Sequence, residues 1–278
     1  MRPSVTVAIP LHRSAPFVDI VLANIAAIDL PDAEIVVSDR TLEDDAAARI
    51  AAATADDPRV EVVASADGLT WVAHHAALLD RAKGPYVTVM SHDDDFGPAW
   101  VRGLVDALDA DPGAVVAFGD LRIHGTDRVV RTMPSPRHPR AEGRPAASDA
   151  ARQLTYWHIA IAYSGVFRTD ALRQHRLRLG AGGPKLERAD DLFMFEVALC
   201  GRLLHVPGTT FDKRFHEAST HIAFSTSPSS AVRFHLSALR ALAQRGRDRT
   251  VPWAAVIVVR RLVGFLVMDT RHRLRQRR

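Results

Sequence analysis

The sequence has a single cysteine, Cys200, among its 278 residues. One cysteine cannot form an intrachain disulfide, and it cannot supply the thiolates of a cysteine-rich zinc site. A chain without disulfides suits a reducing compartment. We therefore expect a cytoplasmic protein whose fold is stabilised by its apolar core.

The sequence also lacks an uncharged run of about 18 apolar residues, the length that a helix needs to cross a membrane. The apolar stretch near the N-terminus, residues 5–9, is short and is followed at once by Pro10, so it is unlike a secretory leader. With 47% hydrophobic and 24% charged residues, the composition excludes disordered, collagen-like and coiled-coil chains. The sequence therefore predicts a globular protein without a clear membrane-spanning segment.

Acidic residues are scarce at the C-terminal end. Residues 240–278 contain 11 Arg and two acids, which gives this segment a net charge of +9. Residues 1–239 have a net charge of −5, so the whole chain has a net charge of +4. An acidic body argues against a nucleic-acid-binding face there. The apolar stretch 251–268, followed by five Arg, is typical of a helix that lies on an anionic membrane surface. A terminal helix that packs on the body with a solvated basic end is the alternative.

Short apolar, β-branched runs alternate with segments of helical spacing along the first half. This order predicts an α/β fold with a mainly parallel sheet flanked by helices, and ligands bind such sheets beyond the carboxyl ends of the strands. The second half is less regular: 131–147 is expected to be a mobile loop, 190–200 a helix and 203–206 a short strand. In the first half, strands are expected at 5–9, 34–38, 60–63, 86–90 and 114–118, and helices at 16–28, 44–54, 71–81 and 98–108.

The strongest chemical signal is a run of three carboxylates, Asp93, Asp94 and Asp95, directly after the strand expected at 86–90. Adjacent carboxylates repel one another, and a divalent cation offsets that repulsion. Hard carboxylate oxygens suit Mg²⁺ or Mn²⁺. The alternative is a solvated acidic turn before the helix at 98–108.

Two further carboxylates, Asp39 and Asp67, follow expected strands. Asp39 can accept hydrogen bonds from a nucleobase or a ribose hydroxyl, or it can form a turn. Asp67 precedes Gly68, where a turn is the stronger interpretation. Both residues are candidates for contact with a nucleotide.

Asp190 and Asp191 open an apolar helix. Acids in a first turn are favoured by the helix dipole. The functional alternative is a general base, because one carboxylate raises the pKa of its neighbour. Downstream, His216 is a candidate metal or phosphate ligand, and Arg214 suits a pyrophosphate.

In their order and spacing these motifs resemble those of the family 2 glycosyltransferases, nucleotide-diphospho-sugar transferases of the GT-A fold. The resemblance covers about residues 4–225: the first strand, the acid after the second strand, the acidic run, and the acidic pair at 190–191. Three residues depart from the family pattern. Ser38 and Ser91 replace the first Asp of two motifs, and Arg40 stands where glycine is usual.

The resemblance implies inverting, metal-dependent transfer of a sugar from a nucleotide-diphosphate sugar to an acceptor hydroxyl, as in polysaccharide biosynthesis. Asp191, or its neighbour Asp190, is then the catalytic base. Mn²⁺ or Mg²⁺ is expected on Asp93, with Asp95, Asp94 and His216 as further ligands, and the loop at 131–147 is expected to close over the site. The nucleotide-sugar subsite is expected to include Pro10, His12, Arg13, Asp39, Asp67, His92, Asp93 and Arg214.

The same resemblance implies a domain organisation and partners. Residues 1–225 are expected to form the GT-A domain, with a nucleotide-sugar-binding half at 1–120 and an acceptor half at 121–225. Residues 226–278 form a helical basic extension. A lipid-linked acceptor and peripheral contact with the inner face of a membrane would fit that extension.

Two other functions remain open. A sugar nucleotidyltransferase of related fold usually has a glycine-rich basic loop after the first strand, whereas residues 11–14 here contain no glycine. A non-catalytic nucleotide-sugar-binding homologue is the second alternative, in which Ser38 and Ser91 mark the loss of activity.

Overall fold

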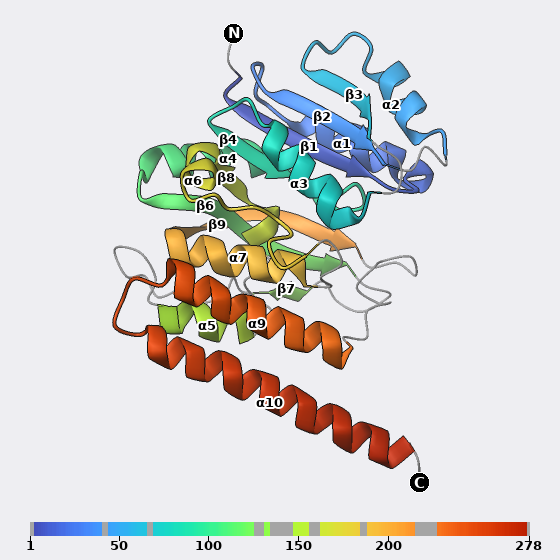
Figure 1. Cartoon of the computed structure of the whole chain (residues 1–278). Coiled ribbons are helices and arrows are strands. Elements are labelled where there is room, and N and C mark those ends of the chain that lie inside the picture. Colours follow the sequence, from blue (N-terminus) through green and yellow to red (C-terminus); the bar gives the residue numbers. More distant parts are fainter. Residues whose placement is uncertain are drawn as a thin grey trace.

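The computed structural model describes residues 3–40, 44–65, 69–124, 131–133, 147–155, 162–183, 188–214 and 227–276. It has an α/β fold around one nine-stranded sheet, in the order β3-β2-β1-β4-β8-β6-β9-β5 with β7 paired to β6 (Figure 1). The α/β class with flanking helices is confirmed. The strands are β1 (Val5–Leu11), β2 (Glu34–Asp39), β3 (Val60–Ala64), β4 (Tyr86–Val89), β5 (Asp95–Phe96), β6 (Ala114–His124), β7 (Arg131–Met133), β8 (Val166–Arg168) and β9 (Arg202–Arg214).

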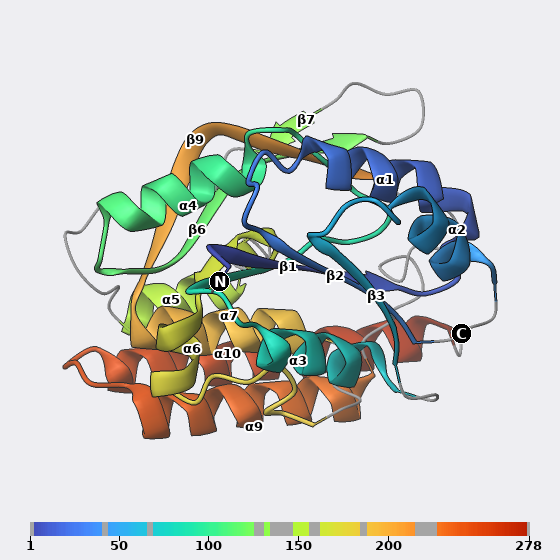
Figure 2. The same cartoon turned by 90° about the horizontal axis from the view of Figure 1, so that it is seen from above.

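Helices cover both faces of this sheet (Figure 2). One apolar cluster contains side chains of α1, α2 and α4, and a second contains those of α3, α5, α6, α7, α9 and α10. A short 3-10 helix, Ala15–Phe17, precedes α1. The bounds are α1 (Val18–Ala27), α2 (Ala46–Ala53), α3 (Trp71–Arg81), α4 (Trp100–Ala110), α5 (Ala147–Thr155), α6 (Thr169–Gln174), α7 (Ala189–Cys200), α9 (Pro228–Arg245) and α10 (Val251–Gln276).

The N-terminal half of the sheet is parallel. β2 and β4 flank β1, and β3 lies beyond β2. Every residue of β1 and β4 is buried, which explains why these strands are continuous apolar runs. β1 does not end before Pro10 as the sequence suggested: Pro10 lies opposite Ser38 and Leu11 opposite Asp39. The carboxyl ends of β1, β2, β3 and β4 therefore lie at the same edge of the sheet.

The other half of the sheet is mixed. β6 pairs in parallel with β9, whereas β8 is antiparallel to both β4 and β6. The strand expected at 203–206 is one part of β9, which is 13 residues long. The polar sequence of its second part, which includes Asp212 and Lys213, concealed it because this stretch is only partly buried.

The loop expected at 131–147 is wrong at both ends. Arg131–Met133 forms β7 on β6, and Ala147 begins α5. Residues 134–146 lie outside the described residues. The expected closure of this loop over a site therefore stays a prediction.

Backbone contact at the centre of the sheet depends on two glycines. A Cβ at Gly119 would lie 2.0 Å from the carbonyl oxygen of Thr209, and one at Gly165 would lie 2.3 Å from that of Ala117. Both distances are shorter than any tolerable contact. Glycine at these positions allows β6 to lie close to β9 and to β8.

The C-terminal helices form an outer layer. α9 packs on α7, and α10 packs on both α9 and α5 (Figure 1). Ala238 and Leu242 of α9 and Ala254 and Val258 of α10 belong to the same apolar cluster as α7. The boundary expected at residue 225 falls outside the described residues and stays a prediction.

Candidate functional site

The end of β1 is held against the acidic run by one histidine. Nδ1 of His92 lies 3.1 Å from the carbonyl oxygen of Pro10, and its ring centroid lies 5.2 Å from that of Phe17. Asp39, at the end of the neighbouring strand, is 1% exposed. The carboxyl ends of β1, β2 and β4 thus bring together Pro10, Asp39 and His92, which the sequence placed in the nucleotide-sugar subsite.

The structure describes some, but not all, of the other residues that were expected in that subsite. His12 donates its backbone N–H to Oγ of Ser14 at 2.8 Å, and Arg13 adopts a left-handed backbone with φ of 51° and is exposed. Left-handed backbone is uncommon for a residue with a side chain and occurs at functional turns. Arg40 donates to the carbonyl oxygen of Leu69 at 2.7 Å. Asp67 lies outside the described residues.

A buried histidine contacts Ser38. Nε2 of His74 lies 2.9 Å from Oγ of Ser38, at the end of β2. Burial, reinforced by the positive charge of Arg40, lowers the pKa of His74 to about 4. His74 is therefore neutral at physiological pH. The sequence analysis assigned His74 no role. The feature that could have indicated one is its place in the first turn of a helix that begins four residues after Asp67, an expected nucleotide contact.

The next residue connects this corner to α7. Nδ1 of His75 lies 2.9 Å from the hydroxyl of Tyr163, whose ring lies 6.1 Å from that of Phe193 on α7. Burial, and then the charge of Asp190, raises the pKa of Tyr163. A continuous set of contacts therefore runs from the end of β2 to the acidic start of α7.

At the start of α7, Asp191 is 3% exposed. Nε of Arg188 donates to its Oδ2 at 2.6 Å, while its Oδ1 is buried without a hydrogen-bond partner. Burial raises the pKa of Asp191 to about 7; Arg188 opposes the shift, and Asp190 adds to it. A carboxylate with one anchored oxygen, one unbonded oxygen and a pKa near neutrality has the properties of a general base.

The three carboxylates of the acidic run have different surroundings. The Asp94 side chain is fully buried, and its two oxygens accept from Nζ of Lys213 at 2.9 Å and from the backbone N–H of Arg214 at 3.1 Å. Burial raises the pKa of Asp94 although Lys213 opposes the shift. Asp95 belongs to β5, opposite Asp212, and forms a 3.4 Å ion pair with Arg214. Asp93 is partly exposed.

These surroundings limit the choice of metal ligands. Within the described ranges, no three His, Cys, Asp or Glu side chains are grouped as a metal site. His216 lies outside them. Both oxygens of Asp94 already accept hydrogen bonds and its side chain is fully buried, which makes Asp94 a poor ligand for a cation that also binds a diphosphate. One carboxylate with diphosphate oxygens is a donor set that suits Mg²⁺ or Mn²⁺.

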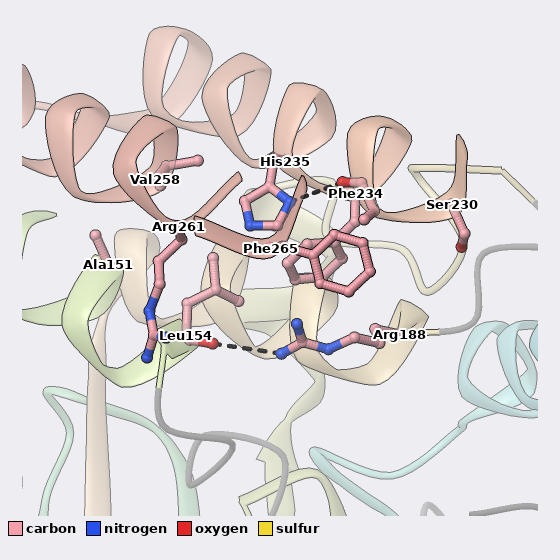
Figure 3. Close-up of a pocket in the computed structure, with 10 residues that line it drawn as sticks. Ala151, Leu154, Arg188, Ser230, Phe234, His235, Val258, Arg261 and Phe265 are labelled. Carbon is pink, nitrogen blue, oxygen red and sulfur yellow. Dashed lines mark hydrogen bonds between the residues drawn. The ribbon is translucent and has the colours of Figure 1, made fainter. Parts of the chain in front are cut away.

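A cavity of about 150 Å³ lies on the other side of Arg188, between α5, α9 and α10 (Figure 3). Arg188 donates to the carbonyl oxygen of Leu154 at 3.4 Å, and its guanidinium carbon lies 4.4 Å from the ring centroid of Phe234. One guanidinium group therefore separates the cavity from Asp191. The lining residues are Ala151, Leu154, Arg188, Ser230, Ala231, Phe234, His235, Val258, Arg261 and Phe265.

Two arginines, Arg188 and Arg261, line this cavity. Nδ1 of His235 donates to the carbonyl oxygen of Ala231 at 2.7 Å. Burial lowers the pKa of His235, and the two arginines lower it further. No local pattern in the sequence indicates this cavity, since its walls come from three helices and Arg188, which are distant along the chain.

Parallel strands that end at a buried carboxylate, beside an acidic run and an acidic helix start, define the GT-A class of nucleotide-sugar-transferase fold. The Glycosyl transferase family 2 model matches residues 6–176. The chain therefore belongs to glycosyl transferase family 2, as the resemblance predicted. None of the curated proteins compared with the sequence matches it significantly.

Solved structures support the fold. Residues 1–349 of Staphylococcus aureus TarS, in complex with UDP-GlcNAc, align with a TM-score of 0.72 and 15% identity over 95% of this chain and 71% of that one. The mannosyltransferase PcManGT from Pyrobaculum calidifontis, in complex with GDP-Man and Mn²⁺, aligns with a TM-score of 0.56 and 18% identity over 96% of this chain and 76% of that one. At these identities the likeness concerns the fold.

Proposed function

We propose that this glycosyltransferase moves a sugar from a nucleotide-diphosphate sugar to an acceptor hydroxyl with inversion at the anomeric carbon. The observation that carries the proposal is the state of Asp191. Its one unbonded oxygen and its pKa of about 7 suit removal of a proton from an alcohol. Attack by that alcohol on the face opposite the leaving diphosphate inverts the sugar.

The donor subsite is proposed at the carboxyl ends of β1, β2 and β4. Asp39 accepts hydrogen bonds from the nucleoside, and Pro10, His12, Arg13 and His92 form the wall next to it. Asp67 and Arg214 complete the subsite as proposed contacts. The solved neighbours suggest the first donors to test, because their structures contain UDP-GlcNAc, UDP or GDP-Man.

The proposed metal ligand is Asp93, with Asp95 and His216 as the other candidates. When bound, Mn²⁺ or Mg²⁺ neutralises charge on the leaving diphosphate. Asp94 instead positions the end of β9, because its carboxylate holds Lys213 and the backbone of Arg214. That contact keeps two cationic residues beside the acidic run.

The acceptor is proposed to approach from the cavity in Figure 3. Arg188 forms part of the cavity wall and also holds Asp191, so an acceptor in the cavity contacts the residue that holds the base. Arg261 on the opposite wall favours an acceptor that carries an anionic group. We expect Arg261→Gln to weaken acceptor binding while donor binding is unchanged.

The test is a screen of UDP- and GDP-sugars with Mn²⁺ or Mg²⁺, measuring nucleoside diphosphate release and the anomeric configuration of the product by NMR. The expected result is release of nucleoside diphosphate and an inverted product, lost in Asp191→Asn and Asp93→Asn. Release of pyrophosphate from a nucleoside triphosphate and a sugar phosphate identifies a nucleotidyltransferase instead. Donor binding without turnover across the acceptor panel supports the non-catalytic alternative.

A further inference from the structure

The outer helix α10 has an unusual surface. Seven large apolar side chains are exposed in the described part of the chain, and all of them lie on α9 or α10. Six belong to α10, and one of them, Trp253, is 69% exposed. The inner side of the helix, with Ala254 and Val258, packs on the body. Thus α10 has an apolar side in the core and another in solvent.

The exposed residues form a stripe rather than a scatter. Trp253, Val256, Val263 and Val267 are spaced by three, seven and four residues, which places them along one side of an α-helix. A helix rises 1.5 Å per residue, so the stripe extends for about 21 Å. Val259 lies at its edge. Arg260 is exposed on the same side of the helix, between Val256 and Val263. Exposed apolar residues gathered along one side of a helix mark a surface that contacts another body.

Positive charge accompanies the stripe. Arg260 and Arg261 lie in the middle of α10, and five Arg occupy residues 271–278. The C-terminal end of α10 points to the same side of the molecule as the carboxyl ends of β1 and β2, and Figures 1 and 2 agree on this placement. In Figure 1, α7 and α9 lie between α10 and the strands β1 and β2.

The stripe on α10 has three candidate surroundings: the interior of a membrane that α10 crosses, a second copy of the chain, and the surface of a membrane. The charges on α10 distinguish them. Val251–Met268 is long and apolar enough to cross a membrane, although it is not an uncharged run. Spanning would place Arg260 and Arg261 at the centre of the bilayer, which is unfavourable, and would remove α10 from α5 and α9. A second copy would bring arginine-rich segments together, and like charges at an interface are repulsive.

We propose that α10 docks the protein on the surface of an anionic lipid bilayer. The apolar stripe lies among the upper acyl chains, while Arg260 extends its guanidinium to the headgroups. The arginines beyond Met268 gain from the negative surface potential.

Vesicle flotation of the full chain tests the proposal without using transferase activity, so its outcome is independent of the proposed function. Phosphatidylcholine vesicles are compared with vesicles that also contain about 30% phosphatidylserine. We expect at least about tenfold stronger binding to the anionic vesicles, weakened by salt. Equal binding to the two kinds of vesicle, or no binding to either, overturns the proposal.

A double variant, Trp253→Glu with Val263→Glu, tests the stripe itself. Both side chains are more than half exposed, so the fold is retained and thermal melting is unchanged. The matched control is Ala52→Glu with Ala53→Glu, which adds the same charge at exposed positions of α2, far from α10 (Figure 1). The stripe variant loses vesicle binding and the control keeps it. A dimer by light scattering that only the stripe variant dissociates, without vesicle binding, shows that a second copy covers the stripe.

Discussion

Replacement of Arg188 by glutamine changes the protonation of the proposed base while leaving that base in place. Nε of Arg188 lies 2.6 Å from Oδ2 of Asp191, and the two side chains are 20% and 4% exposed. Two unit charges about 4 Å apart interact by about 4 kcal/mol at an effective dielectric constant of about 20. That energy corresponds to about three pKa units.

The measured shift will be smaller, because water and the glutamine amide partly replace the lost charge. We expect the pKa of Asp191 to rise by at least about one unit above its value of about 7. The ionised fraction at pH 7 then falls from about a half to about a tenth, so kcat/KM at pH 7 falls about fivefold. At pH 9 the activity of the variant approaches that of the wild type.

The assay is the pH profile of kcat/KM, measured between pH 5.5 and 9.5 (about 0.5-unit steps suffice for a shift of this size). Arg245→Gln is the matched control. Arg245 of α9 forms a 3.1 Å ion pair with Glu196, which lies on α7 as Asp191 does, and the two side chains are 19% and 7% exposed. Both variants lose stability, but only Arg188→Gln shifts the ascending limb of the pH profile of kcat/KM to higher pH. An ascending limb that does not move refutes the assignment of Asp191 as the base.

Other variants separate catalysis from folding. The pKa of Asp191 is higher in the folded state than in the unfolded state, so the folded state loses stability as pH rises towards 7 and Asp191 ionises. The stability of the wild type relative to Asp191→Asn should therefore fall by about 1.4 kcal/mol per pH unit between pH 5 and 7. Urea unfolding measures this difference. Asp94→Asn breaks a buried ion pair and should lower stability by about 3 kcal/mol. Asp93 is partly exposed, so Asp93→Asn should lower stability less while abolishing transfer; equal melting temperatures would contradict this division. Gly119→Ala should prevent stable folding, because its Cβ meets the Thr209 carbonyl, whereas Gly264→Ala on open α10 surface should raise stability by about 1 kcal/mol.

Local patterns were sufficient for the parallel half of the fold. β1, β2, β3 and β4 are short β-branched runs that are buried or adjacent to buried strands, and α3 begins and ends at the residues that spacing indicated, Trp71 and Arg81. The second half was harder to predict. β9 mixes buried and exposed residues over 13 positions, and β5 has only two, so neither gives a clear periodic signal.

The candidate site shows the same division. Asp39 and the acidic run were found because parallel strands place their carboxyl ends at one edge, a rule that needs no tertiary information. The different surroundings of Asp93 and Asp94 could not be read from adjacent identical letters. They arise from Lys213, which is 119 residues away from Asp94 and reaches it only through the pairing of β5 with β9.

The sequence by itself determined the α/β class, the family and the types of chemical group that are present, because these depend on short-range periodicity and on the order of motifs. Tertiary structure decided what state each group is in. Arg188 and burial place the pKa of Asp191 near neutrality, Ser38 finds a partner in His74, and α10 keeps one apolar side outside the core. Burial and charge at a given atom are sums over neighbours from distant segments, and those neighbours are known only once the chain is folded.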